Sequence, residues 1–138
     1  MNSILLQIAA KYLKILFLSF AFIALIRGHN HPGGGFIGGL LAALYIVYNS
    51  LAFTSRQSKQ QLKIRPEHYM GAGLTCALLS FLPGIFSGTT LMKGIWWSIN
   101  TSLFGEIKLG TPLLFDIGVF LTVMGVTLLF LFTLSIKK

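Results

Sequence analysis

The sequence carries little charge, and acids are especially scarce. Only 10% of its 138 residues are charged, three acids against eleven lysines and arginines, whereas soluble globular domains carry about 25% charged residues. Hydrophobic residues make up 54% of the chain, more apolar surface than a soluble core of this size can hide. We therefore expect the bilayer to be the solvent. The basic residues lie between or beside apolar runs, so we interpret them as topology signals and not as a nucleic-acid site.

Cysteine is also nearly absent, and the chain starts without a basic leader. The single Cys76 lies within an apolar run, which excludes a disulfide framework and a cysteine metal cluster. The apolar stretch at residues 15–26 ends in Arg27 and Gly28 without a small-residue cleavage site. We expect an uncleaved first span and not a signal peptide.

Four segments are long and apolar enough to cross the hydrocarbon layer of roughly 30 Å as helices. The sequence predicts an all-α integral membrane protein, a four-helix bundle forming one domain over residues 1–138, with spans at about 4–27, 32–53, 67–87 and 112–136. Proline is favoured at the first position of a helix, so we expect Pro32 and Pro112 to begin the second and fourth spans. Asn30 or His31 could cap the second span.

Two polar connections predict the orientation. Residues 54–66 carry basic residues and no acid, which indicates a water-exposed loop. Residues 88–111 place Trp96 and Trp97 near Lys93, and this composition fits a short helix or loop at the periplasmic membrane surface. An even number of spans puts both termini on the side of the 54–66 loop. That side collects most of the basic residues, so the positive-inside rule predicts cytoplasmic termini.

The glycine-rich stretch contains a nucleotide-binding pattern that we reject. Gly33, Gly35 and Gly38 form a literal G-x-G-x-x-G. That fingerprint requires a preceding strand and an acid about 20 residues later. Here an apolar helix precedes it, and no acid occurs before Glu67.

The same glycines fit two roles in a membrane helix. Gly34 and Gly38, like Gly35 and Gly39, are four residues apart, so a helix containing them carries a groove free of side chains. The groove could accept a neighbouring helix at close range. Alternatively, the exposed backbone could form an ion or water site.

Two histidines precede the glycines. His29 and His31 are too few for a metal site without further ligands, and His68 is expected on the opposite side of the membrane. Either histidine could relay protons, because imidazole exchanges protons near neutrality. The alternative is an interfacial cap or hydrogen-bond partner.

Asp116 is the only acid expected inside a span, about one helical turn past Pro112. A carboxylate among apolar residues is unfavourable by a few kcal/mol unless it meets a cation, a donor or water, and such acids commonly mark ion or proton routes. The alternative is an acid that complements the positive N-terminus of its own helix.

Two motifs resemble a known family. Residues 28–40 (GHNHPGGGFIGGL) resemble the signature of the B subunit, MnhB or MrpB, of Mrp-type multisubunit Na⁺/H⁺ antiporters. Residues 115–119 (FDIGV) and 125–127 (GVT) resemble the last helix of that family. The motifs, their order, the number of spans and the chain length all agree, so the resemblance covers essentially the whole chain.

The resemblance implies a small subunit of a bacterial inner-membrane assembly that exchanges cytoplasmic Na⁺, or K⁺ in some cases, for protons. Its partners would be large antiporter subunits related to those of respiratory complex I and other small membrane subunits. No organic cofactor is implied, only the transported Na⁺ and H⁺. Importance carries over to Pro32, residues 33–35, Phe36, His29 and Asp116, which match the family pattern.

Three hypotheses follow. In the first, Asp116, with His29 as a second candidate, lies beside an ion or proton route shared with sister subunits. In the second, the glycine-rich helix makes the chain a scaffold that carries no ion path of its own. In the third, the chain is the equivalent subunit of a membrane-bound hydrogenase-type complex. Enzymatic chemistry in the chain itself is not expected, because it has three acids and no nucleophile with an evident base.

Overall fold

The computed structural model describes residues 4–28, 32–53, 57–58, 60, 62, 64–86, 88, 94–101 and 105–135. Within these residues, four helical segments are long and apolar enough to cross a membrane. They are α1 (Ile4–Arg27), α2 (Gly35–Ala52), α4 (Pro66–Leu79) continued by α5 (Leu82–Phe86), and α6 (Thr111–Ser135). The prediction of a four-helix membrane protein is confirmed.

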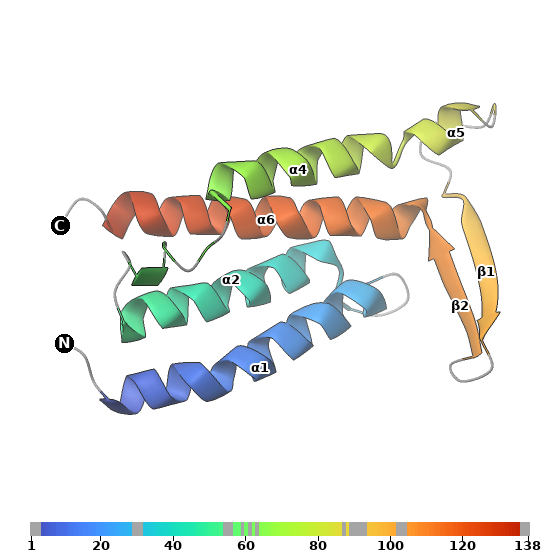
Figure 1. Ribbon diagram of the computed structural model, residues 1–138. Coiled ribbons are helices and arrows are strands. Elements are labelled where there is room, and N and C mark those ends of the chain that lie inside the picture. Colours follow the sequence, from blue (N-terminus) through green and yellow to red (C-terminus); the bar gives the residue numbers. More distant parts are fainter. Residues whose placement is uncertain are drawn as a thin grey trace.

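The four spans lie in a row and not in a closed bundle (Figure 1). The order across the row is α1, α2, α6, α4, so that the last span in the sequence packs between α2 and α4. Helices α2 and α6 run in the same direction, because Gly35 of α2 lies against Asp116 of α6 and Gly39 lies against Phe120. The N-termini of α2 and α6 therefore meet at one end of the molecule.

Small residues fill the contacts between the helices, and large apolar side chains face outward. The buried apolar side chains include several alanines, Ala10, Ala21, Ala42, Ala43 and Ala52. By contrast, Phe22 is 61% exposed and Leu134 is 69% exposed. This distribution suits lipid as solvent, because membrane helices associate through small residues that allow close backbone approach.

The second helix begins later than expected. It starts at Gly35, and Pro32 lies in a bend before it, so the prediction that Pro32 occupies the first helical position is wrong. Gly34 adopts φ 97° and ψ −178°, and its N–H donates to the carbonyl oxygen of Ala24 at 2.8 Å. This bond holds Gly34 against the end of α1, and α2 begins at the next residue. Asn30 and His31, the expected caps, lie outside the described residues.

The third span is broken near Pro83. Helix α4 ends at Leu79 and α5 starts at Leu82. Proline lacks the N–H that would donate to the carbonyl four residues earlier, and its ring crowds that carbonyl. For Pro83 that carbonyl belongs to Leu79, the last residue of α4.

A β-hairpin precedes α6, where a helix or loop was expected. Strands β1 (Trp96–Thr101) and β2 (Gly105–Gly110) pair antiparallel, with Trp96 opposite Gly110. In β1 the residues Trp97, Ile99 and Thr101, all common in strands, alternate with others, a period-two pattern typical of strands. The hairpin is fastened to α6, because the N–H of Thr111 donates to the Ile95 carbonyl at 3.1 Å and the N–H of Ile95 donates to Thr111 Oγ1 at 3.2 Å.

The basic 54–66 connection lies partly outside the described residues, which omit Arg56, Lys59, Lys63 and also Lys93. Arg65, the residue before α4, is exposed. Helix α1 begins and α6 ends at the same end of the row (Figure 1). Which side of the membrane this end faces stays a prediction.

Candidate functional site

Asp116 lies in the second turn of α6 and faces the place where the chain passes from α1 to α2. A β-carbon placed on Gly34 would lie 3.7 Å from Asp116 Oδ1 and 3.8 Å from Oδ2. One placed on Gly28 would lie 3.1 Å from Oδ2. The carboxylate thus meets the bare backbone of two glycines that both belong to the 28–40 motif.

Glycine is required at both positions for steric reasons. A side chain on Gly28 would overlap the Cα of Gly34 and come within 2.5 Å of its nitrogen. Gly34 is buried, and its φ of 97° with ψ of −178° lies in a region that is essentially restricted to glycine. The two glycines therefore allow the ends of α1 and α2 to come close enough to meet the carboxylate together.

The electrostatic surroundings of Asp116 include the N-terminus of α2. The first amides of a helix have no acceptor within that helix. For α2, the N–H of Gly34 donates to Ala24 and the N–H of Gly38 donates to the Gly34 carbonyl at 3.0 Å, so the first-turn amides at residues 35–37 carry the partial positive charge of the helix end. Gly35 packs against the backbone carbonyl of Asp116, which brings this charge beside the start of α6.

Asp116 is partly exposed and not sealed in the protein interior. Its helix is 25 residues long, and at 1.5 Å per residue Asp116 lies roughly 7 Å from the start of that helix. A partly exposed carboxylate at this depth, beside helix-end amides, can pair transiently with a monovalent cation.

The other glycines of the motif lie at contacts between helices. Gly33 and Gly38 face α1, where added β-carbons would lie 2.6 Å from the Ala24 carbonyl oxygen and 2.8 Å from the Ala21 carbonyl oxygen. Gly39 faces α6, where an added β-carbon would lie 2.6 Å from the Phe120 carbonyl oxygen. The glycine face of α2 is therefore occupied by protein on both sides.

The remaining sequence candidates lie apart from the carboxylate or outside the described residues. Phe36 points outward and is 57% exposed. Pro112 packs beside Gly94 and Gly110, where the hairpin joins α6. A β-carbon added to Gly94 would lie 3.0 Å from the Pro112 ring, and one added to Gly110 would lie 3.1 Å from it. His29 lies outside the described residues, and its role stays a prediction.

Sequence reasoning did not single out two contributors to the site. Gly28 lies within the motif but was not chosen, although a glycine directly after a helix is a common helix end. The Ala24 carbonyl, which accepts the Gly34 N–H, carries no signal in the sequence. Among the described residues there is no group of three or more histidine, cysteine or acidic side chains that could hold a metal ion.

Comparison with known proteins places the chain in a family. A family model described as a domain related to the MnhB subunit of Na⁺/H⁺ antiporters matches residues 5–129. The chain belongs to the MnhB family. The resemblance found in the two motifs is confirmed, and both motifs lie inside the matched range.

Curated relatives of this MnhB-family chain match it over nearly their whole length. It is 32% identical to the Na⁺/H⁺ antiporter B subunit of Bacillus subtilis over 134 residues, covering 97% of this chain and 94% of the relative. It is 30% identical to the Na⁺/H⁺ antiporter B subunit of Alkalihalophilus pseudofirmus, with coverage of 97% and 93%. A putative antiporter subunit mnhB2 of Staphylococcus haemolyticus is 32% identical, with coverage of 97% and 95%.

A solved structure has the same fold. A chain in the structure of the Mrp complex from Dietzia sp. DQ12-45-1b matches with a TM-score of 0.77 and 28% identity. The match covers 96% of the MnhB-family chain but 14% of the Dietzia chain. In that complex the matching unit is thus a small part of a much longer polypeptide.

Proposed function

We propose that the chain is the B subunit of an Mrp-type antiporter in the bacterial cell membrane, where the complex exchanges cytoplasmic Na⁺, or K⁺, for protons. Its partners in this role are the large antiporter subunits and the other small membrane subunits. The family match over residues 5–129 and the fold shared with a chain of an Mrp complex support this role. The chain acts as a transporter subunit and not as an enzyme, and the role needs no organic cofactor beyond the transported ions.

Within the complex, Asp116 contributes to an ion or proton route. The observation that carries this step is the position of its carboxylate, which faces Gly28 and Gly34 beside the N-terminus of α2 while remaining partly exposed. Its partial exposure gives access to a proton or cation from a neighbouring subunit. His29, which precedes this turn in the sequence, is the second candidate for the route.

The test replaces Asp116 in the intact complex and measures antiport in everted vesicles. Asp116→Asn keeps the size and polarity of the side chain but removes its charge, so we expect Na⁺-dependent proton movement to fall by at least about tenfold. Glu67→Gln is the matched control, because Glu67 is an exposed acid in the first turn of α4, which packs beside Gly125 in the middle of α6 and away from Asp116. Unchanged antiport in Asp116→Asn would remove the direct role of this carboxylate.

The scaffold hypothesis, in which the glycine-rich helix serves assembly, concerns a different feature, the glycine face of α2, which is filled by α1 and α6 of the same chain. Gly38 has no room for a side chain between Ala21 and Phe120, so Gly38→Leu should disrupt the fold and prevent assembly. Native gels of the same membranes separate the two hypotheses. Transport lost in Asp116→Asn with a complex of normal size supports the route, whereas transport lost only together with the complex supports scaffolding alone.

A further inference from the structure

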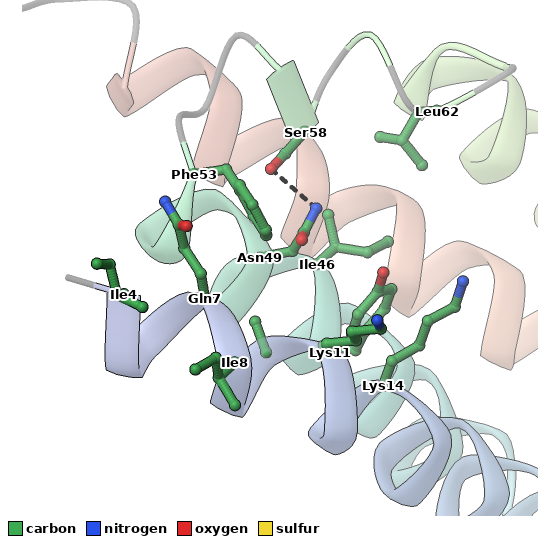
Figure 2. A pocket seen from close by; sticks show the side chains of 12 residues that line it. Ile4, Gln7, Ile8, Lys11, Lys14, Ile46, Asn49, Phe53, Ser58 and Leu62 are labelled. Atoms are coloured by element: carbon green, nitrogen blue, oxygen red, sulfur yellow. Dashed lines mark hydrogen bonds between the residues drawn. The ribbon is translucent and has the colours of Figure 1, made fainter. Parts of the chain in front are cut away.

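A cavity of about 770 Å³ lies between the start of α1 and the end of α2, at the opposite end of these helices from Asp116 (Figure 2). Its volume is many times the roughly 30 Å³ that one water molecule occupies in the liquid, so side chains of another protein have room to enter. None of its lining residues belongs to the Asp116 site. The cavity is therefore a separate feature of the molecule.

The wall that α1 contributes to this cavity is cationic. Lys11 and Lys14 both line it and are three residues apart, so they lie on one face of the helix. Both side chains are exposed. The Lys14 ammonium lies 5.9 Å from the centre of the Tyr45 ring, which directs it across to α2.

The two lysines lie well inside the span. At 1.5 Å per residue, Lys11 lies about 10 Å and Lys14 about 15 Å along α1 from Ile4. The end of α2 gives a similar depth, because Tyr45 precedes Ala52 by seven residues, or about 10 Å. A cation at this depth is unfavourable unless an anion, an acceptor or water meets it, and two like charges at this spacing also repel each other.

The part of the chain that lines the cavity supplies no anion. The acids of the chain are Glu67, Glu106 and Asp116, and none of them is among the described residues that form the cavity walls. Asn49 and Ser58, two polar residues of the cavity, are buried and bonded to each other, with Asn49 Nδ2 donating to Ser58 Oγ at 3.2 Å. A negative charge for the lysines therefore has to come from another molecule.

The position of α1 leaves this wall accessible to another helix. Among the described residues, α1 forms one end of the row and packs mainly on α2 (Figure 1). Only Ala10 and Ala21 of its 24 residues are buried. Ile8, which lines the cavity one turn before Lys11, is 52% exposed. A helix that lies along α1 can thus reach the cavity from the side.

We propose that this cavity is the docking site for a membrane helix of a sister subunit, which places a carboxylate against the ammonium groups of Lys11 and Lys14. The role rests on the proposed function, because it requires a complex of several membrane subunits. The depth of the lysines favours this occupant. A phospholipid phosphate stays at the membrane surface and a soluble anion does not enter the hydrocarbon layer, whereas an acid on a spanning helix is carried to the depth that its sequence sets.

The test compares assembly of the intact complex with stability of the full-length chain purified alone. Lys11→Gln with Lys14→Gln removes both charges, so we expect the sister subunits that copurify in mild detergent to fall by about tenfold or more. Lys11→Arg with Lys14→Arg should retain them. The thermal unfolding midpoint of the purified chain should not fall in the glutamine variant, and a lower midpoint would assign the lysines to the fold of the subunit instead.

Lys137→Gln with Lys138→Gln is the matched control, because it removes the same charge from residues that follow the last span. Undiminished copurification of the Lys11→Gln, Lys14→Gln variant would overturn the docking site, assign solvation of the lysines to water and leave the proposed function intact. Failure of the unmodified chain to copurify with any antiporter subunit would overturn both.

Photocrosslinking identifies the occupant. In native membranes, Ile8→p-benzoylphenylalanine should form an adduct with a sister subunit, at a spanning segment that contains an aspartate or glutamate. Lys14→Glu should weaken copurification, and replacement of that partner acid by lysine should restore it. Adducts with lipid alone, or with a segment free of acids, would contradict the proposal.

Discussion

At the scale of single residues, the site depends on how Gly34 holds its backbone. The N–H of Gly34 points back to the Ala24 carbonyl, and its Cα side faces the Asp116 carboxylate. The φ of 97° with an extended ψ is a conformation that residues with a β-carbon avoid. Gly88, at φ 63°, is also left-handed but stands in open space.

This contrast gives a matched pair of substitutions. Gly34→Asn should destabilise the chain by about 1 to 3 kcal/mol, because asparagine tolerates φ near 60° but not the conformation of Gly34. Gly88→Asn should leave stability nearly unchanged for the same reason. The midpoints of thermal unfolding in detergent measure both effects. Similar midpoints for the two variants would show that Gly34 is not conformationally restricted.

Asp116 could be chosen from the sequence alone, because a lone acid among apolar residues is expensive in a membrane. Its surroundings could not. The contact with Gly28 and Gly34 depends on the parallel packing of α2 with α6, which brings together residues about 80 positions apart. The sequence also suggested Pro32 as the helix start, because proline fits the first turn, but the bond between Gly34 and Ala24 delays it to Gly35.

At the scale of elements, α4 and α6 pack through glycines on both helices. A β-carbon on Gly73 would press on Thr122 Oγ1 and lie 2.6 Å from the Gly118 carbonyl oxygen. A β-carbon on Gly118 would lie 2.6 Å from the Ala77 nitrogen. Such close backbone approach is a main source of association between helices in lipid, where the hydrophobic effect does not act between them.

Gly73→Ala and Gly71→Ala test this contact within one helix. The first should destabilise the chain by about 1 to 3 kcal/mol, because the added methyl meets backbone atoms of α6 that cannot move independently. Gly71 has no atom within 4 Å of an added β-carbon, so alanine there should be neutral or stabilising by up to about 1 kcal/mol through helix propensity. Unfolding titrations in mixed detergent compare the two, and equal stabilities would contradict the close contact.

The elements themselves could be predicted to different degrees. Long apolar runs indicated the four spans, because length and hydropathy alone determine whether a helix can cross a membrane. The hairpin was missed, since its two tryptophans also suit a membrane surface. Residues 102–104, which join its strands, are Ser, Leu and Phe, so the glycine and asparagine that usually mark a tight turn are absent.

At the scale of the whole molecule, the row order α1, α2, α6, α4 could not be predicted. The glycine groove of the second span indicated a close helix contact but not which helix makes it, and α1 and α6 are apolar around their circumference, so no face of theirs indicates a neighbour. The orientation in the membrane, however, is a prediction that the sequence supports directly. In the sequence, most lysines and arginines lie near the start of the first span, in the 54–66 connection or after the last span, and Arg27, Lys93 and Lys108 lie in segments expected on the other side.

Reporter fusions to the full complex measure this orientation. Alkaline phosphatase inserted between β1 and β2 should be active, because the positive-inside rule places that end in the periplasm. A green fluorescent protein joined after residue 138 should fluoresce, since it folds in the cytoplasm. An active phosphatase at the C-terminus would reverse the assignment, and with it the direction in which Asp116 opens.

The central position of α6 has a consequence for biogenesis. As the last of the four spans to leave the ribosome, it reaches the translocon after α1, α2 and α4 have already entered the bilayer. Until then the glycines that face α6, Gly35 and Gly39 of α2 and Gly73 of α4, lack this neighbour, whereas the glycines that face α1 already have theirs. We therefore expect the row to close late, when α6 docks between α2 and α4. An insertion chaperone or a sister subunit that shields those faces during synthesis would act in the interval before α6 arrives.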